Sequence, residues 1–95
     1  MVYLTIYDIA KDKTRTKLAN SLEAVGLYRI QKSVFAGKVK RKILRPLIKA
    51  YAEKLEEGDR LYVLSLEDRQ VEGMFAHGLE ENLDLILGRV ITLTI

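Results

Sequence analysis

The feature that most constrains the fold is a pair of β-prone segments that are apolar on both faces. The first segment, VYLTIYDI, covers residues 2–9, and the second, RLYVLSL, covers residues 60–66. Side chains alternate between the two faces of a strand, and in both segments each face receives at least two large apolar side chains. A sheet built from these strands needs a cover on both faces. The two helices that the rest of the sequence predicts, described below, can cover only one face. The sequence therefore predicts self-association to a homodimer.

The segment that follows the first strand predicts a helix. Asp12 or Thr14 can cap its N-terminus, and apolar side chains recur at helical spacing behind them. Gly26 suits the left-handed position that ends a helix. Residues 28–39 are β-prone and long enough for two short strands, with a bend near residues 31–33.

The strongest amphipathic pattern covers residues 43–55. Pro46 requires this helix to begin only a few residues upstream, because a proline deep inside a helix removes a hydrogen bond and clashes with the preceding turn. Gly58 is predicted to close the helix. With the strand at residues 60–66, the order is β-α-β-β-α-β. This order predicts an α+β fold with a ferredoxin-like sheet.

The C-terminal third is predicted to add further strands. Residues 70–76 read as a strand, residues 79–87 as a short helix or an irregular segment, and residues 89–95, RVITLTI, as a terminal strand. We expect one domain over residues 1–95, with its core in residues 1–78. A free β-prone edge at the chain end would favour aggregation. The segment 79–95 is therefore predicted to pair with the other subunit.

Positive charge is concentrated in one half of the chain. Residues 11–49, here called the basic region, contain twelve Lys and Arg and two acids, a net charge of +10. Residues 50–95 contain four Lys and Arg and ten acids, a net charge of −6. Segregated positive charge is typical of a surface that binds a polyanion. The alternative is a solvated basic surface that binds nothing.

Several classes of chemistry are excluded or disfavoured. The chain has no cysteine, which excludes thiolate catalysis and disulfides and agrees with a cytoplasmic location. Its only histidine, His77, lies in the turn-like segment AHG and is predicted to be a surface residue. No apolar run approaches the length needed to cross a bilayer, so no membrane partner is expected.

Asp8 is the acid with the greatest chemical interest. It ends an apolar strand at the parity of Leu4 and Ile6, where a carboxylate is costly to bury. One interpretation is that Asp8 accepts backbone N–H groups at the turn into the helix. The other is that two copies near a dimer axis form a paired-carboxylate site for Mg²⁺, or Mn²⁺ in its place. Such an ion can activate water for phosphodiester hydrolysis.

A second candidate surface lies in residues 28–39. Around the second predicted strand, Arg29, Gln31, Ser33 and Phe35 alternate onto one side. A guanidinium, an amide, a hydroxyl and an aromatic ring suit contacts with phosphates and bases. An ordinary half-exposed strand face is the alternative.

Two motifs in this half of the chain resemble a known family. They are the strand ending YDI, at residues 7–9, and the pattern G-L-x-R-I-Q-x-S-V-F-x-G at residues 26–37. Together with the basic start of the first helix, they resemble the CRISPR-associated Cas2 family over roughly the first 65 residues. The resemblance implies a ferredoxin-like homodimer that partners the spacer integrase of prokaryotic antiviral immunity. It also implies metal-dependent endonuclease activity on single-stranded RNA or double-stranded DNA.

The resemblance assigns roles to individual residues. Asp8 matches the metal-binding aspartate of the family, and Tyr7 matches its neighbouring tyrosine, so both are predicted to be catalytic. Basic and aromatic positions of the family match Arg15, Lys17, Arg29 and Phe35. The full set of predicted nucleic-acid-binding residues is Arg15, Lys17, Arg29, Ser33, Phe35 and Lys38.

Three functions are compatible with these features. The first is a Mg²⁺-dependent endonuclease of spacer acquisition, with one site shared by the dimer. The second is a non-catalytic adaptor that holds DNA for the integrase. The third is a toxin-type ribonuclease of the same fold, similar to virulence-associated protein D. The first depends on Asp8, whereas the second depends on the basic surface and the C-terminal strands.

Overall fold

The computed structural model describes residues 1–75, 77–78 and 80–89. The elements are β1 (Val2–Asp8), α1 (Asp12–Ala24), β2 (Tyr28–Gln31), β3 (Val34–Gly37), α2 (Arg41–Ala52), β4 (Arg60–Leu66), α3 (Asp68–Glu72) and α4 (Glu80–Ile86). The first six follow the predicted β-α-β-β-α-β order. The strands form one antiparallel sheet in the order β2-β3-β1-β4. The predicted α+β, ferredoxin-like class is confirmed.

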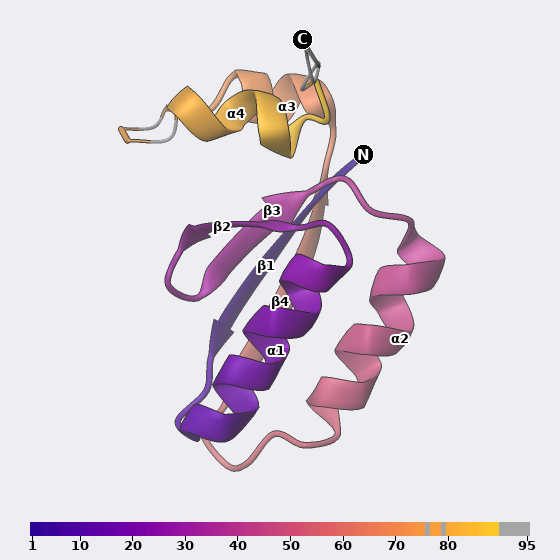
Figure 1. Ribbon diagram of the computed structural model, residues 1–95, viewed down its shortest axis with the longest axis vertical. Helices are drawn as coiled ribbons and strands as arrows, with labels where there is room; N and C mark the ends of the chain where they lie inside the picture. The colour runs from indigo at the N-terminus through magenta and orange to yellow at the C-terminus, as the bar shows by residue number, and fades with distance from the viewer. Residues whose placement is uncertain (76, 79, 90–95) are drawn as a thin grey trace, which may run out of the picture.

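The main core lies between the sheet and helices α1 and α2, which cover one face (Figure 1). Leu18 and Leu22 of α1 and Phe35 of β3 are completely buried there. The two helices are also joined by a hydrogen bond of 2.9 Å between the hydroxyls of Ser21 and Tyr51. Central strand β1 pairs with β3 and β4 and packs against the two helices. These contacts fix the position of its C-terminal end.

The N-terminus of α1 differs from the prediction. Its N-cap is Lys11, without a side-chain capping hydrogen bond, so neither Asp12 nor Thr14 caps the helix. Asp12 is instead the first helical residue, and its carboxylate pairs with the Arg15 guanidinium one turn later. A carboxylate in the first turn still interacts favourably with the positive end of the helix dipole.

The C-terminus of α1 agrees with the prediction for Gly26. This residue has φ = 108°, a left-handed conformation that glycine adopts without steric cost. The N–H groups of Gly26 and Leu27 donate to the carbonyls of Glu23 at 3.1 Å and Leu22 at 3.0 Å. This pair of bonds is a Schellman motif, which satisfies the last carbonyls of the helix.

Helix α2 begins at Arg41, five residues before Pro46, as the proline requires. It ends at Ala52, so the prediction that Gly58 closes it is wrong. After Ala52 the backbone tightens, since the Lys54 N–H donates to the Tyr51 carbonyl three residues back at 2.9 Å. Leu55 lies beyond the helix but still packs against the core, which explains the apparent continuation of the apolar pattern.

The prediction of a strand at residues 70–76 is also wrong, because the chain forms α3 over residues 68–72. Here the Glu67 N–H donates to the side-chain Oε1 of Gln70 at 2.8 Å. A helix-starting residue bonded by the side chain three positions later is one half of a capping box. The spacing of Glu67 and Gln70 is visible in the sequence and indicates the start of a helix.

The face of the sheet opposite α1 and α2, here called the second face, is covered at one end by α3 and α4 (Figure 1). Val71 of α3 and Ile86 and Leu87 at the end of α4 pack there against Val2 and Ala36. Residues 80–86 are thus a helix on their own sheet, so the predicted intersubunit strand pairing is wrong for them. The rest of the predicted terminal strand, residues 90–95, lies outside the described residues.

The other end of the second face is uncovered within the described part of the chain. Tyr62 and Leu64 of edge strand β4 are 52% and 44% exposed there. Ile6 pairs directly with Tyr62 and shares this face, and Asp8 follows at its lower end. The predicted need for a second cover therefore applies to this half of the face only.

Among the described residues, no helix has the length and apolar character that a membrane span requires.

Candidate nucleic-acid and metal site

A cleft of about 620 Å³ opens where β1 ends, beside α1 and the β2–β3 turn. Five of the eight predicted site residues line it: Tyr7, Asp8, Arg15, Arg29 and Ser33. The other lining residues are Ile9, Thr16, Ala19, Asn20 and Lys32. The fold thus brings together residues from three separate segments, and the cleft contains three cations and one acid.

Asp8 is the exposed last residue of β1. Strand alternation and the register with β4 place it opposite Arg60, on the same face as Ile6 and Tyr62. Among the described residues, the Asp8 carboxylate makes no hydrogen bond and no ion pair. The carboxylate is therefore available to a ligand.

The structural role considered for Asp8 is performed by Asp59. Its two carboxylate oxygens accept the backbone N–H groups of Ala10 at 3.1 Å and Glu56 at 2.9 Å. The hydrogen bond from Glu56, followed by that from Ala10, lowers the pKa of Asp59. Because Asp59 satisfies the turn that follows β1, the interpretation of Asp8 as a backbone acceptor is not supported.

Tyr7 and Phe35 form the floor beneath the cleft. Their rings are stacked with centroids 6.3 Å apart, and both side chains are buried. The Tyr7 hydroxyl donates to the Lys32 carbonyl at 3.3 Å. This geometry favours a positioning role for Tyr7, which holds the β2–β3 turn, over the predicted catalytic one.

Phe35 does not reach the surface, so its predicted direct contact with nucleic acid is wrong in this structure. Its ring instead supports Arg29, whose guanidinium carbon lies 5.0 Å from the ring centroid. A cation over an aromatic face is attracted by the ring quadrupole. Phe35 therefore acts through Arg29, which is exposed and lines the cleft.

The four-residue strand face predicted from Arg29 to Phe35 does not exist as one surface. The chain turns at residues 32–33, and the register shifts between Arg29 and Gln31. Arg29 and Phe35 end up directly opposite each other on two strands. Ser33 reaches the cleft from the turn, whereas Gln31 does not line it.

Arg15 of α1 lines the cleft. Its guanidinium donates to the Ile9 carbonyl at 3.0 Å and also pairs with Asp12. These bonds fix the loop between β1 and α1, directly after Asp8. Arg15 is 41% exposed, so its remaining donors can still reach a phosphate.

Lys17 and Lys38 do not line the cleft. Lys17 is exposed on α1, and Lys38 pairs with Asp68 of α3 at 2.8 Å. That contact lowers the pKa of Asp68, mainly through the side-chain hydrogen bond from Lys38. Lys38 thus joins β3 to α3, a tertiary role that the sequence did not indicate.

Three polar lining residues were not singled out from the sequence: Thr16, Asn20 and Lys32. Thr16 and Asn20 are four residues apart on α1, so both point to the same side of the helix. This helical spacing is visible in the sequence and indicates that the two side chains share one side of α1. Lys32 lies in the turn, and only its tertiary position brings it to Asp8.

Each chain offers a magnesium ion one carboxylate at the cleft, that of Asp8. Among the described residues there is no cluster of three or more His, Asp and Glu side chains. Mg²⁺ usually keeps several waters and binds through one or two carboxylates together with substrate phosphates. An available Asp8 carboxylate from each of two chains satisfies that requirement.

Comparison with known sequences identifies a family. Residues 1–74 match the family described as CRISPR associated protein Cas2. The CRISPR-associated endoribonuclease Cas2 of Korarchaeum cryptofilum is 35% identical over 72 residues, which is 73% of this chain and 75% of that protein. The corresponding protein of Aeropyrum pernix is 34% identical over 80 residues, 82% of this chain and 87% of that protein. A relative from Pyrobaculum aerophilum is 44% identical over a shorter stretch, 50% of this chain and 53% of that protein.

Solved structures agree with this assignment. The crystal structure of Streptococcus pyogenes Cas2 has a TM-score of 0.67 and covers 82% of this chain and 100% of that one; at 20% identity it supports the fold alone. A hypothetical protein from Thermus thermophilus has a TM-score of 0.59 and 34% identity, over 70% of this chain and 80% of that one. With the family match over residues 1–74 and relatives above 30% identity across most of the chain, this protein belongs to the Cas2 family of CRISPR-associated proteins.

Proposed function

We propose that this protein is a Mg²⁺-dependent endonuclease of spacer acquisition and that it acts as a homodimer. The observation that carries the proposal is the Asp8 carboxylate, which is exposed and without a partner among the described residues, beside a cleft with three cations. Asp8 of each subunit would hold the ion, and Mn²⁺ is a suitable substitute. Curated relatives are named endoribonucleases, which supports RNA as the first substrate to test.

The residues of the chain divide the work by their chemistry. Arg29 and Lys32 are exposed cations at the cleft and would bind phosphate oxygens on either side of the scissile bond. Tyr7 and Phe35 would keep these cations in place from below. When bound, Mg²⁺ supplies Lewis-acid chemistry and activates water for phosphodiester hydrolysis.

The uncovered half of the second face supports the dimer. Tyr62, Leu64 and Ile6 form an apolar strip on this face that leads to Asp8. A second copy seated on the strip would remove its apolar surface from water. Because Asp8 lies at the end of the same strip, the contact would also bring two Asp8 carboxylates near each other.

The decisive variant is Asp8→Asn, which keeps the shape of the side chain and removes its charge. Mutation of a residue that hydrogen-bonds to a metal ligand typically lowers metal affinity or activity by about 10–100-fold. Loss of the ligand itself is therefore expected to lower RNA cleavage by more than about a hundredfold. Asp84→Asn on α4, an exposed Asp distant from the cleft, is the matched control and should cleave as the wild type does. Cleavage in single turnover with Mg²⁺, Mn²⁺ or EDTA is the measurement.

Activity of Asp8→Asn at the wild-type level, or cleavage that persists in excess EDTA, would reject the nuclease proposal. RNA binding and the molar mass in light scattering should be unchanged in Asp8→Asn, which separates a lost metal from a lost fold. A short duplex DNA assayed beside the RNA decides which substrate is preferred.

One observation favours a second candidate, a DNA-holding adaptor of the integrase. Ten of the twelve cations of the basic region make no ion pair with any described residue, more than one catalytic cleft requires. A wild-type protein that binds duplex DNA and the integrase but cleaves neither RNA nor DNA would support the adaptor. The same result would reject the endonuclease.

A further inference from the structure

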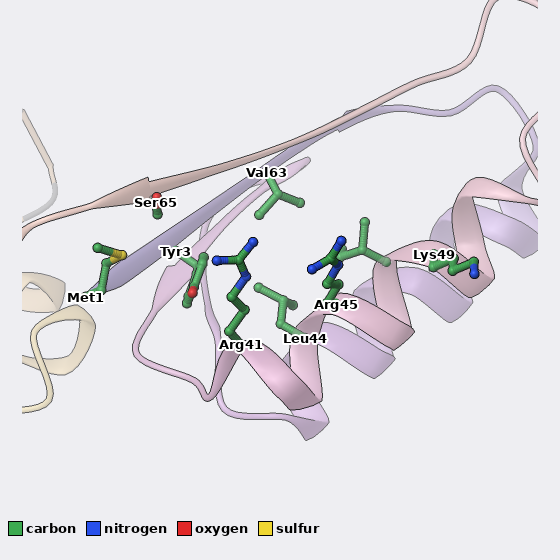
Figure 2. Close-up of a pocket in the computed structure, with 9 residues that line it drawn as sticks. Met1, Tyr3, Arg41, Leu44, Arg45, Lys49, Val63 and Ser65 are labelled. Atoms are coloured by element: carbon green, nitrogen blue, oxygen red, sulfur yellow. The ribbon is translucent and has the colours of Figure 1, made fainter.

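A groove of about 640 Å³ lies between helix α2 and edge strand β4, on the face of the sheet that α1 and α2 cover (Figure 2). It is lined by Met1, Tyr3, Arg41, Leu44, Arg45, Ile48, Lys49, Val63 and Ser65. None of these residues lines the cleft at Asp8. The groove is therefore a separate feature of the surface.

Three cations of α2 border this groove. Arg41, Arg45 and Lys49 are spaced four residues apart, so they form a row along one side of the helix over about 12 Å. Figure 2 shows the guanidinium groups of Arg41 and Arg45 extending toward β4, with Val63 facing them. The groove has no acidic lining residue, and none of the three cations has an ion-pair partner among the described residues.

One of the three groove cations, Arg41, lies against the electrostatic preference of the helix, whereas Lys49 lies in the last turn, where a cation is favourable. Lys40 is the N-cap of α2, and Arg41 and Lys42 follow in a first turn that contains no acid. The N-terminus of a helix carries partial positive charge, so cations there are unfavourable. Local choices that oppose stability are expected where the surface has a function. An anionic ligand at this end of α2 would reverse the penalty.

The floor of the groove is apolar. This property distinguishes between a double-stranded and a single-stranded nucleic acid as the ligand. Leu44, Ile48 and Val63 lie beside a half-buried aromatic side chain, Tyr3. In a duplex the bases are stacked inside, and such a floor would have no partner. A single strand presents phosphates to a row of cations and its unpaired bases to apolar or aromatic side chains, which is the usual pattern of single-strand binding.

We propose that the groove between α2 and β4 is a second nucleic-acid site, which binds single-stranded RNA or DNA through Arg41, Arg45 and Lys49. Its phosphates would follow the row of cations, and one or two bases would contact the floor at Val63. The inference extends the proposed function, because the groove would hold a strand that continues beyond the Asp8 cleft. It does not depend on cleavage, since binding requires neither Asp8 nor a metal.

The test measures the binding of a labelled oligo-dT strand of about 12 nucleotides by its fluorescence anisotropy in the presence of EDTA. The variant Arg41→Gln with Arg45→Gln is compared with Lys40→Gln with Lys42→Gln. Both double variants remove two positive charges from the N-terminal half of α2 or its N-cap, but only the first removes groove residues. We expect the groove variant to bind about tenfold or more weakly and to flatten the log–log salt slope by about 1.4, or 0.7 for each lost phosphate contact. The control is expected to change much less.

Equal weakening in the two doubles would overturn the proposal, because it would show an effect of net charge alone. Unchanged binding in the groove variant would also overturn it while leaving the Asp8 site intact. Failure of the wild type to bind any strand would overturn both this inference and the proposed function. Both doubles should melt at or above the wild-type temperature, because each removes an unfavourable cation from the helix N-terminus.

The base contact has its own control. An abasic strand of equal length should bind more weakly than oligo-dT to the wild type, and Val63→Ser should reduce that difference. Equal binding of the abasic strand, or equal competition by poly-glutamate, would reject the single-strand assignment. The second result would identify an acidic protein segment as the occupant instead.

Discussion

The carboxylate of Asp59 accepts the backbone N–H of Ala10 at 3.1 Å, a contact between residues 49 positions apart in the sequence. It ties the residue before β4 to the turn after β1. The turn therefore needs no help from Asp8, whose carboxylate has no partner among the described residues. A second aspartate, which lies outside the family motifs, thus makes the contact with this turn that had been considered for Asp8.

This relationship predicts a specific dependence of stability on pH. Hydrogen bonds from Glu56 and Ala10 lower the pKa of Asp59 in the folded state. Its contribution to stability is therefore fully present above its unfolded pKa of about 3.9 and is lost as the pH falls through the lower folded value. Asp59→Asn should melt at a lower temperature than the wild type at neutral pH, with the difference shrinking below about pH 4. Thermal melts across the acidic range provide the measurement.

The pKa of Asp68 is also lowered, by its hydrogen bond from Lys38, so Asp68→Asn is measured in the same series of thermal melts for comparison. A difference between the wild type and Asp59→Asn that stays constant from neutral to strongly acidic pH would contradict the assigned role of Asp59.

Thr5 offers a site for stabilisation. Its side chain is completely buried in the central strand, and its hydroxyl has no hydrogen-bond partner in the described structure. A buried polar group without a partner costs about 1–3 kcal/mol. Thr5→Val keeps the branched shape and removes the hydroxyl, so we expect stabilisation of about 1 kcal/mol and a rise in melting temperature of about 4–8 °C. Thr5→Ser retains the hydroxyl and loses a methyl group, and it should be less stable than the wild type.

RNA binding should depend on the turn cation at the cleft. Lys32→Gln removes a side chain that lines the cleft and is expected to flatten the log–log salt slope by about 0.7 on a single strand. Lys13→Gln, an exposed cation of α1 outside the cleft, should change the slope less. Anisotropy titrations over a series of salt concentrations distinguish the two. Binding that does not respond to salt in the wild type would show that the basic region is only a solvated surface.

The oligomeric state should depend on the uncovered half of the second face. Leu64→Glu places a charge in the apolar strip and is expected to convert a micromolar dimer to a monomer, as measured by light scattering. Ser65→Glu introduces the same charge at the next residue, on the opposite face of β4, and should remain dimeric. A mass of 10.9 kDa for the wild type would contradict the dimer itself.

The terminal segment should contribute to the same assembly. Removing residues 90–95 leaves in the chain the core residues Ile86 and Leu87 and the ion pair between Arg89 and Glu72, which hold α4. If these residues form the predicted intersubunit strand, the truncated dimer should have a higher dissociation constant than the wild type. It should also melt at a lower temperature. A truncated dimer with an unchanged melting temperature would show that the segment has no such role.

Much of the fold could be predicted from local patterns. The alternation in β1 and β4 indicated which side chains share a face, and Gly26 marked the end of α1 because few other residues adopt its φ of 108°. The predicted bend near residues 31–33 is also confirmed, since β2 ends at Gln31 and β3 begins at Val34. These features are determined by neighbouring residues, whose steric preferences and periodicity are visible without tertiary information. The strand predicted at residues 70–76 is wrong because the contact between Glu67 and Gln70 starts a helix in residues whose local β-propensity favoured a strand.

The site was only partly accessible from the sequence, since its geometry depends on contacts between distant segments. The sequence by itself determined that Asp8 ends an apolar strand and that the region after it is basic. Only the tertiary structure decided that Phe35 lies beneath Arg29, that Lys38 pairs with Asp68, and that Asp59 rather than Asp8 holds the turn after β1. Packing and long-range hydrogen bonding select among side chains that are chemically equivalent in the sequence. Two aspartates next to strand ends look alike until the fold places one of them against backbone N–H groups and leaves the other exposed.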